Sequence, residues 1–155
     1  MLAADQDLDE VVRRGIECCR RDDWDRGLYF LGQVAQADRS TALPGLFYSY
    51  LGYGIARCQR RMQEGLKLCR HSIKVQFYEP DNYVNLARTC LLANERNEAV
   101  HAILDGLKVD PQNLELQGLH RDLGIRRPPI LSFLGRSNPL NLLLGRVRSL
   151  FTPSK

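Results

Sequence analysis

The sequence lacks any apolar run that approaches the roughly 20 residues needed to cross a bilayer, so no membrane span is expected. Residues 1–12 contain several acids and lack the basic and apolar regions of a signal peptide. No glycine-rich phosphate loop and no His-Glu-x-x-His spacing occurs in the 155 residues. These absences predict a cytoplasmic protein that is not an enzyme and uses no metal and no cofactor.

Cysteine is present, but without the spacing of a site. The thiols are odd in number and contain no Cys-x-x-Cys pair, which argues against a disulfide framework and against a zinc site. We expect them to act as small hydrophobic side chains on helix faces, with a reactive thiol as the alternative. The five are Cys18, Cys19, Cys58, Cys69 and Cys90.

Acidic residues are absent from Arg126 onward, where six basic residues occur. The first 25 residues, by contrast, contain eight acids against four arginines. The net charge of +4 therefore combines a weakly acidic body with a basic C-terminal segment.

One internal unit of 34 residues spans positions 80–113. Four side chains in its first half share the spacing of one helix face: Tyr83, Leu86, Ala87 and Cys90. Residues 93–97 then interrupt the apolar pattern, as a tight turn does. A second set lies on one face of the following helix: Ala99, Ile103, Gly106 and Leu107. Because proline cannot continue a helix, Pro111 is expected to mark its end.

Two weaker copies precede this unit. The small residues Gly27, Gly65 and Ala99 lie 38 and 34 positions apart, where two helices would cross closely. The sequence therefore predicts helical units at about 7–40, 44–79 and 80–113, followed by a capping helix at 114–124.

An aromatic residue and a Leu-Ala pair in one helix, with a small residue and a terminal proline in the next, resemble the tetratricopeptide repeat. In residues 80–113 these are Tyr83, Leu86-Ala87, Ala99 and Pro111. The resemblance implies an all-α superhelix, or solenoid, of about three such helical hairpins plus a capping helix and a C-terminal helix. It also implies a non-enzymatic protein–protein interaction module: an adaptor, or an assembly factor with a chaperone-like role, which holds another protein or peptide in a concave groove.

In this family the first helix of each pair lines the groove. Carried onto this sequence, the groove-facing positions are Ile16, Arg20, Ser49, Tyr53, Arg57, Val84, Arg88 and Leu91. The three arginines among them predict a ligand with acidic groups and an apolar anchor. Members that bind chaperone tails clamp a terminal carboxylate with Lys and Asn. Val12 and Ile16 stand at the first of those positions here, so the resemblance does not extend to that ligand.

The segment 125–155 breaks the repeat. Asn138 and Pro139 predict the start of a helix over 139–151, because Asn caps helices and proline favours their first turn. Its apolar stripe comprises Leu140, Leu143, Leu144, Val147, Leu150 and Phe151. Tails of this type resemble those of small bacterial tetratricopeptide proteins.

Three interpretations of the stripe remain open. It packs on the repeats or fills their groove; it docks on another protein or on a second copy, giving a homodimer; or it lies on an anionic membrane surface. The last would make the chain a membrane-peripheral protein anchored by a basic amphipathic helix, the alternative to the adaptor. Nucleic-acid binding is not expected, because the six basic residues lack interleaved stacking aromatics.

Overall fold

The structure, a computed structural model, describes residues 2–37 and 42–124, which form seven helices and no strand. The helices are α1 (Leu2–Arg20), α2 (Trp24–Gln36), α3 (Gly45–Gln59), α4 (Met62–Val75), α5 (Pro80–Leu92), α6 (Arg96–Val109) and α7 (Leu114–Asp122). All belong to one compact unit that ends at Leu123. None of these helices is long and apolar enough to cross a membrane. The predicted helix 139–151 lies outside the described residues, so its three interpretations stay predictions.

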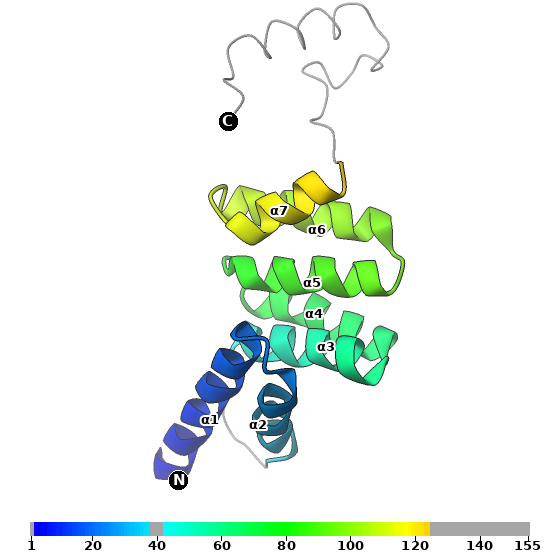
Figure 1. The fold of residues 1–155 in the computed structure, drawn as a ribbon. Coiled ribbons are helices and arrows are strands. Elements are labelled where there is room, and N and C mark those ends of the chain that lie inside the picture. Colours follow the sequence, from blue (N-terminus) through cyan, green and yellow to red (C-terminus); the bar gives the residue numbers. More distant parts are fainter. Residues whose placement is uncertain (1, 38–41, 125–155) are drawn as a thin grey trace, which may run out of the picture. The chain divides into compact units, whose positions relative to one another are not determined.

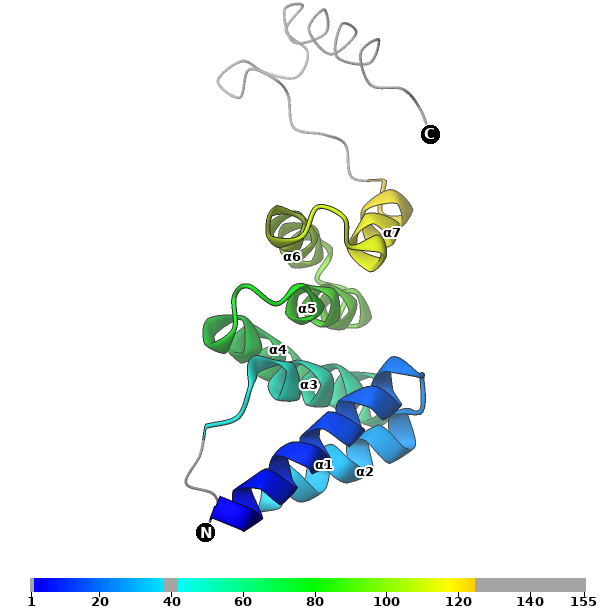
Figure 2. The same ribbon diagram turned by 90° about the vertical axis from the view of Figure 1, so that its left-hand side faces the viewer.

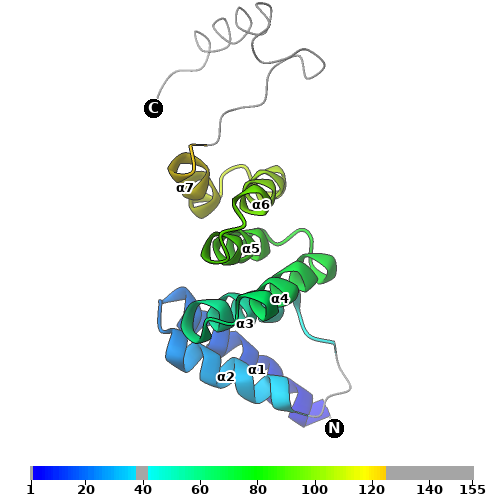
Figure 3. The same cartoon turned by 90° about the vertical axis from the view of Figure 1, so that its right-hand side faces the viewer.

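Successive helices pair, and the pairs stack on one another (Figure 1). Helix α1 packs on α2, α3 on α4 and α5 on α6, while α7 covers α5 and α6. The first helices also touch in series, α1 with α3, α3 with α5 and α5 with α7. Figures 2 and 3 show the same layers from two sides. This arrangement confirms the expected all-α solenoid of three helical hairpins with a further helix at the end.

Small residues let the two helices of a pair approach closely. A Cβ atom on Gly27 would lie 2.2 Å from Cys19 Sγ, and one on Gly65 would lie 2.6 Å from the Gly52 carbonyl oxygen. The third pair uses Ala87 and Ala99, both fully buried. The backbones of the first two pairs therefore approach closely at their crossings, as the spacing of small residues predicts.

The turn inside each pair contains one residue with a left-handed backbone. These residues are Asp22, Arg60 and Asn94, with φ angles of 64°, 59° and 61°. Such a conformation reverses the chain after a helix, and Asn and Asp tolerate it best among residues with a side chain. Asp22 and Asn94 each occupy the second position after the preceding helix. They are therefore structurally equivalent.

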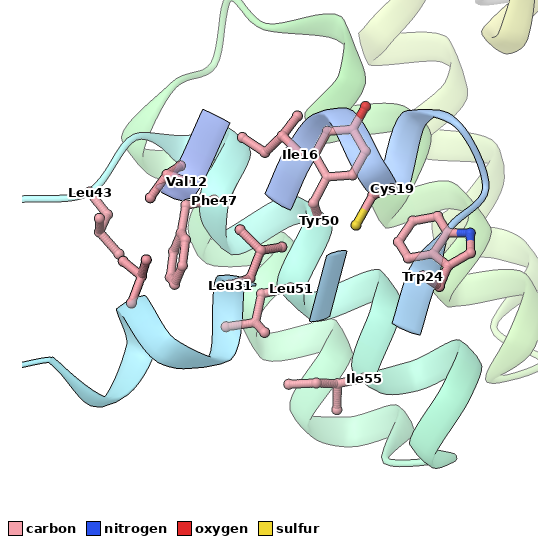
Figure 4. Close-up of a cluster of buried hydrophobic side chains, with 11 residues drawn as sticks. Val12, Ile16, Cys19, Trp24, Leu31, Leu43, Phe47, Tyr50, Leu51 and Ile55 are labelled. Atoms are coloured by element: carbon pink, nitrogen blue, oxygen red, sulfur yellow. The ribbon is translucent and has the colours of Figure 1, made fainter. Parts of the chain in front are cut away.

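A cluster of buried apolar side chains joins the first pair to α3. Figure 4 shows Trp24 beside Cys19 and Tyr50, with Leu31 and Phe47 further along the same seam. Leu31 is completely buried, and Cys19 and Phe47 are nearly so. Burial of this apolar surface supplies the main driving force for packing the first pair onto the second. It also fixes the position of Trp24, whose ring forms one wall of the site described next.

Candidate functional site

The first helices and the start of α2 enclose a hollow of about 580 Å³. Its walls come from α1, the α1–α2 turn, α2, α3, α5 and α7, and consist of Cys19, Arg20, Asp22, Trp24, Tyr50, Tyr53, Arg57, Asp81, Arg88 and Glu115. Four of the predicted groove residues meet here: Arg20, Tyr53, Arg57 and Arg88. The volume is within the range of ligand sites, but the walls are more polar than is usual for a small-molecule pocket, since six of the ten lining residues are charged.

Three residues from three helices form what we call the Asp81 network. Arg20, at the end of α1, donates to Asp81 Oδ2 at 2.8 Å and to the hydroxyl oxygen of Tyr50 at 3.1 Å. The Tyr50 hydroxyl in turn donates to Asp81 Oδ2 at 2.7 Å. Only 26% of the Asp81 side chain is exposed. Because Tyr50 lies on α3 and Asp81 in the first turn of α5, the network ties α1, α3 and α5 together.

Protonation in the Asp81 network follows from these bonds. Burial opposes the charge of Arg20, but the hydrogen bonds with Asp81 and Tyr50 outweigh it and raise the pKa of Arg20. Burial, together with the Asp81 carboxylate, raises the pKa of Tyr50. The guanidinium is therefore charged and the phenol neutral throughout the physiological range.

Trp24 Nε1–H and the Arg57 guanidinium form a second contact, which we call the anion site. Both donate to the same oxygen, Asp22 Oδ1, each at 2.7 Å. The Arg57 guanidinium also lies over the Trp24 ring, 5.3 Å from its centroid, a cation–π geometry. Asp22 is in the α1–α2 turn, and 73% of its side chain is exposed. A carboxylate from the chain itself thus occupies this pair of donors.

Hydrogen bonds from Arg57 and then from Trp24 lower the pKa of Asp22, and the charges of Arg57 and Arg88 lower it further. Asp22 in turn raises the pKa of Arg57. Arg88 lies 5.7 Å from the centroid of the Tyr53 ring and pairs with Glu115 at 3.0 Å. Two guanidinium groups therefore act on the position that Asp22 holds.

Each arginine of the hollow has an acidic partner. Arg20 pairs with Asp81, Arg57 with Asp22, and Arg88 with Glu115. The lining residues therefore contain three positive and three negative charges, and no net charge. The prediction of added positive charge identified the cations but missed the acids that neutralise them.

The other predicted groove residues do not line this hollow. Ser49 is fully buried and accepts a hydrogen bond from Asn85 Nδ2 at 2.8 Å. Ser49 lies in the seam between α3, α4 and α5, since Cys69 on α4 and Asn85 on α5 both contact it. Val84, on α5, is also buried. Leu91 is half-buried away from the hollow. We therefore leave these three out of the site.

Ile16 lines a different, mostly apolar hollow of about 590 Å³ on the other side of Arg20. Its walls are the middle of α1, the start of α3 and the end of α4, and include Val12, Leu43, Leu46 and Val75. Ile16 itself is largely buried in the core cluster. The structure thus separates Ile16 from the arginine-lined hollow.

One group of side chains has the spacing of metal ligands without suiting a metal. The ligand atoms of Cys90, Glu95 and Glu98 lie within 4.8 Å of one another. Arg70 already donates to both carboxylates, at 2.6 Å to Glu98 and 3.1 Å to Glu95. Burial raises the pKa of the Cys90 thiol to about 12, so it is not a thiolate at neutral pH. Arg70 therefore fulfils the electrostatic role that a cation would have here.

The buried thiols behave as the sequence predicts. Burial raises the pKa of Cys19 and that of Cys69 to about 12, and both are small side chains inside helix seams. Cys58 is exposed, but its pKa is also raised by partial burial.

Stacked helix pairs whose first helices share one hollowed face define the tetratricopeptide-repeat fold. The tetratricopeptide domain of Arabidopsis OM64 has this fold, with a TM-score of 0.61 and 12% identity over 76% of this chain and 94% of that one. The first such domain of Spaghetti (RPAP3), bound to the HSP90 peptide SRMEEVD, gives 0.60 at 13% identity over 77% and 91%. The second domain of human RPAP3, in complex with the HSP70 peptide SGPTIEEVD, gives 0.57 at 14% over 77% and 99%. No family model and no curated protein matches the sequence.

Proposed function

We propose that the chain is a non-enzymatic protein–protein interaction module, an adaptor or assembly factor that binds an acidic peptide segment in the arginine-lined hollow. One observation carries the proposal: α1, α2, α3, α5 and α7 all contribute to a hollow whose walls hold three guanidinium groups and three aromatic rings, besides the three carboxylates that pair with the arginines. Guanidinium groups form bidentate bonds with carboxylates, and aromatic rings supply apolar surface at little entropic cost. An extended peptide with acidic and apolar side chains satisfies both.

Two solved structures of the same fold support this choice. These two RPAP3 domains are bound to peptides that both end in Glu-Glu-Val-Asp. The arginines of the hollow support an acidic ligand for the present chain, but Val12 and Ile16 stand where the family members that bind chaperone tails have the first polar residue of their clamp. We therefore propose an acidic peptide as the ligand class, without assigning the chaperone tails themselves.

Selection from a random peptide library on the immobilised protein tests the proposal. The wild-type chain is expected to enrich peptides that combine Asp or Glu with an apolar residue. The variant Arg57→Glu/Arg88→Glu is expected to lose that enrichment, because both changes reverse a charge in the hollow. Arg61→Glu/Arg96→Glu, which changes the charge equally on arginines outside the hollow, should keep it. Equal enrichment by wild type and the hollow variant would remove the hollow as the binding site.

A further inference from the structure

The carboxylate of Asp22 has the position of a ligand rather than of a structural group. It lies on the rim of the hollow, largely in solvent, yet it receives two short hydrogen bonds from side chains that belong to the hollow itself. The neighbouring Asp23 performs the structural task at this turn, since its side chain caps α2 by accepting from the Arg26 amide at 3.3 Å. Capping of the helix therefore does not require the Asp22 carboxylate.

The donors of the anion site also have contacts that do not involve Asp22. Trp24 is 7% exposed and packs edge-on against Tyr53, with ring centroids 5.0 Å apart. Arg57 extends from α3 over the Trp24 ring. Because the indole is fixed by the core and the guanidinium lies over it, we expect the two N–H groups to keep converging on one point when Asp22 turns away.

Resting on the proposed function, we infer that Asp22 is an internal substitute for the ligand. In the free chain its carboxylate fills the anion site formed by Trp24 Nε1–H and Arg57, and a carboxylate of the bound peptide takes its place. The charge of Arg88, which already acts on this position, adds to the attraction for the incoming group.

Exchange at the anion site requires little rearrangement. Asp22 belongs to a turn between two helices and can rotate its exposed carboxylate into water without moving α1 or α2. Exposed ion pairs of this kind contribute little free energy, so a peptide that adds apolar contacts in the hollow outcompetes the single side chain. The internal carboxylate also neutralises Arg57, so that anions making no other contact bind weakly.

The substitution Asp22→Asn tests this exchange with little risk to the fold. The third helix pair already has asparagine, Asn94, with the same left-handed backbone at the equivalent turn position. The matched control is Asp105→Asn, which removes one negative charge from an exposed pair with Lys108 on α6, away from the hollow. Circular dichroism and thermal melting confirm that both variants fold.

Binding is measured by fluorescence anisotropy with a labelled peptide that alternates leucine and glutamate. Asp22→Asn is expected to bind this peptide about two- to fivefold more tightly than wild type, the ratio that corresponds to one exposed ion pair. Asp105→Asn should match wild type. In the background of Arg57→Gln the effect of Asp22→Asn should vanish, because the shared donor is gone. Amidating the C-terminus of the peptide distinguishes a terminal carboxylate, whose binding then weakens, from a side-chain carboxylate, whose binding does not.

Unchanged or weaker binding by Asp22→Asn, with binding still lost in Arg57→Glu/Arg88→Glu, would overturn the exchange while leaving the proposed function intact. Equal tightening by Asp22→Asn and Asp105→Asn would also overturn it, since general charge would then explain the gain. If no variant binds the peptide saturably, the proposed function fails along with the exchange.

Discussion

The Asp81 network and the anion site place the same three kinds of group together in different surroundings. Each joins an arginine, an aromatic side chain with a polar hydrogen, and a carboxylate that accepts from both. The side chain of Asp81 is 26% exposed and connects three helices, whereas that of Asp22 is 73% exposed and lies in a turn. Burial and connectivity, more than bond length, therefore decide which carboxylate is structural and which is replaceable.

The largest effect is expected at the crossing of α3 and α4, because the Asp81 network and the anion site both depend on the position of α3. Gly65→Ala would place a Cβ atom 2.6 Å from the Gly52 carbonyl oxygen and 2.8 Å from the Ala56 Cβ, so α4 must move away from α3. We expect a loss of about 3 kcal/mol in the free energy of unfolding, the upper range for over-packing. Because α3 contributes Tyr50 and Arg57, the Asp81 network and the anion site should weaken together. Urea denaturation measures the loss.

Gly118→Ala is the matched control, since a Cβ atom on Gly118 meets nothing within 4 Å. Alanine favours a helix over glycine, so this variant should gain about 0.5–1 kcal/mol. Similar stability changes in both glycine variants would contradict the close crossing of α3 and α4.

Asp81→Asn should affect the Asp81 network and leave the anion site intact, because only the network contains Asp81. It removes the charge that pairs with Arg20 and leaves the buried Tyr50 hydroxyl with a poorer acceptor, so we expect a cost of about 2 kcal/mol. Asp22→Asn should lower the urea midpoint far less, because its carboxylate is 73% exposed and connects no helices in the way that Asp81 does. Equal loss of stability in the two variants would contradict the division into a structural and a replaceable carboxylate.

The rate at which Cys19 is alkylated also distinguishes the structural carboxylate, Asp81, from the replaceable one, Asp22. Cys19 lines the hollow at the end of α1, is 3% exposed and has its pKa raised to about 12. Its alkylation therefore requires local opening of α1, and Asp81→Asn should accelerate it by about tenfold for every 1.4 kcal/mol lost there. Asp22→Asn should not accelerate it. Mass spectrometry of the Cys19 peptide after timed alkylation at pH 8 gives both rates; a faster reaction in Asp22→Asn would assign Asp22 a structural role.

The smallest effect is expected outside the hollow, at the contact of Arg70 on α4 with Glu98 on α6. Hydrogen bonds from Arg70 lower the pKa of Glu98. A lowered pKa stabilises the fold fully above the ordinary range of a glutamate, and this contribution is lost as the pH falls through the lowered value. Glu98→Gln should therefore cost about 0.5 kcal/mol at pH 7, and the difference from wild type should vanish in acid. Urea midpoints across the acid range test it; a difference that grows as the pH falls would contradict the sign.

The repeat was readable from the sequence because it depends on local spacing. Gly27, Gly65 and Ala99 mark the crossings, and helix α6 ends at Val109, before Pro111. The directions of side chains on the first helices were less predictable. Helices α3 and α5 are packed on more than one side, so Ser49 and Val84 face the interior although their spacing allows a groove position.

The sequence did not predict the acidic residues of the hollow, because each ion pair joins an arginine to an acid far away in the chain, as in Arg20 with Asp81 and Arg57 with Asp22. A signal was nonetheless present. Asp81 and Glu115 both occupy the first turn of a helix and stand 34 residues apart, the length of one repeat, and both pair with arginines of the hollow. No comparable signal marks Asp22, whose partners follow from the packing of Trp24 against α3.

The most direct test of the account uses the single tryptophan, whose indole N–H gives one resonance in a ¹H–¹⁵N spectrum. In wild type Trp24 Nε1–H donates to Asp22, so Asp22→Asn should move this resonance, and adding the leucine–glutamate peptide should return it toward the wild-type position. The peptide should have no such effect in Asp22→Asn/Arg57→Gln. An indole resonance that is the same in wild type and Asp22→Asn, or that the peptide leaves unmoved in Asp22→Asn, would contradict the exchange of carboxylates at the anion site.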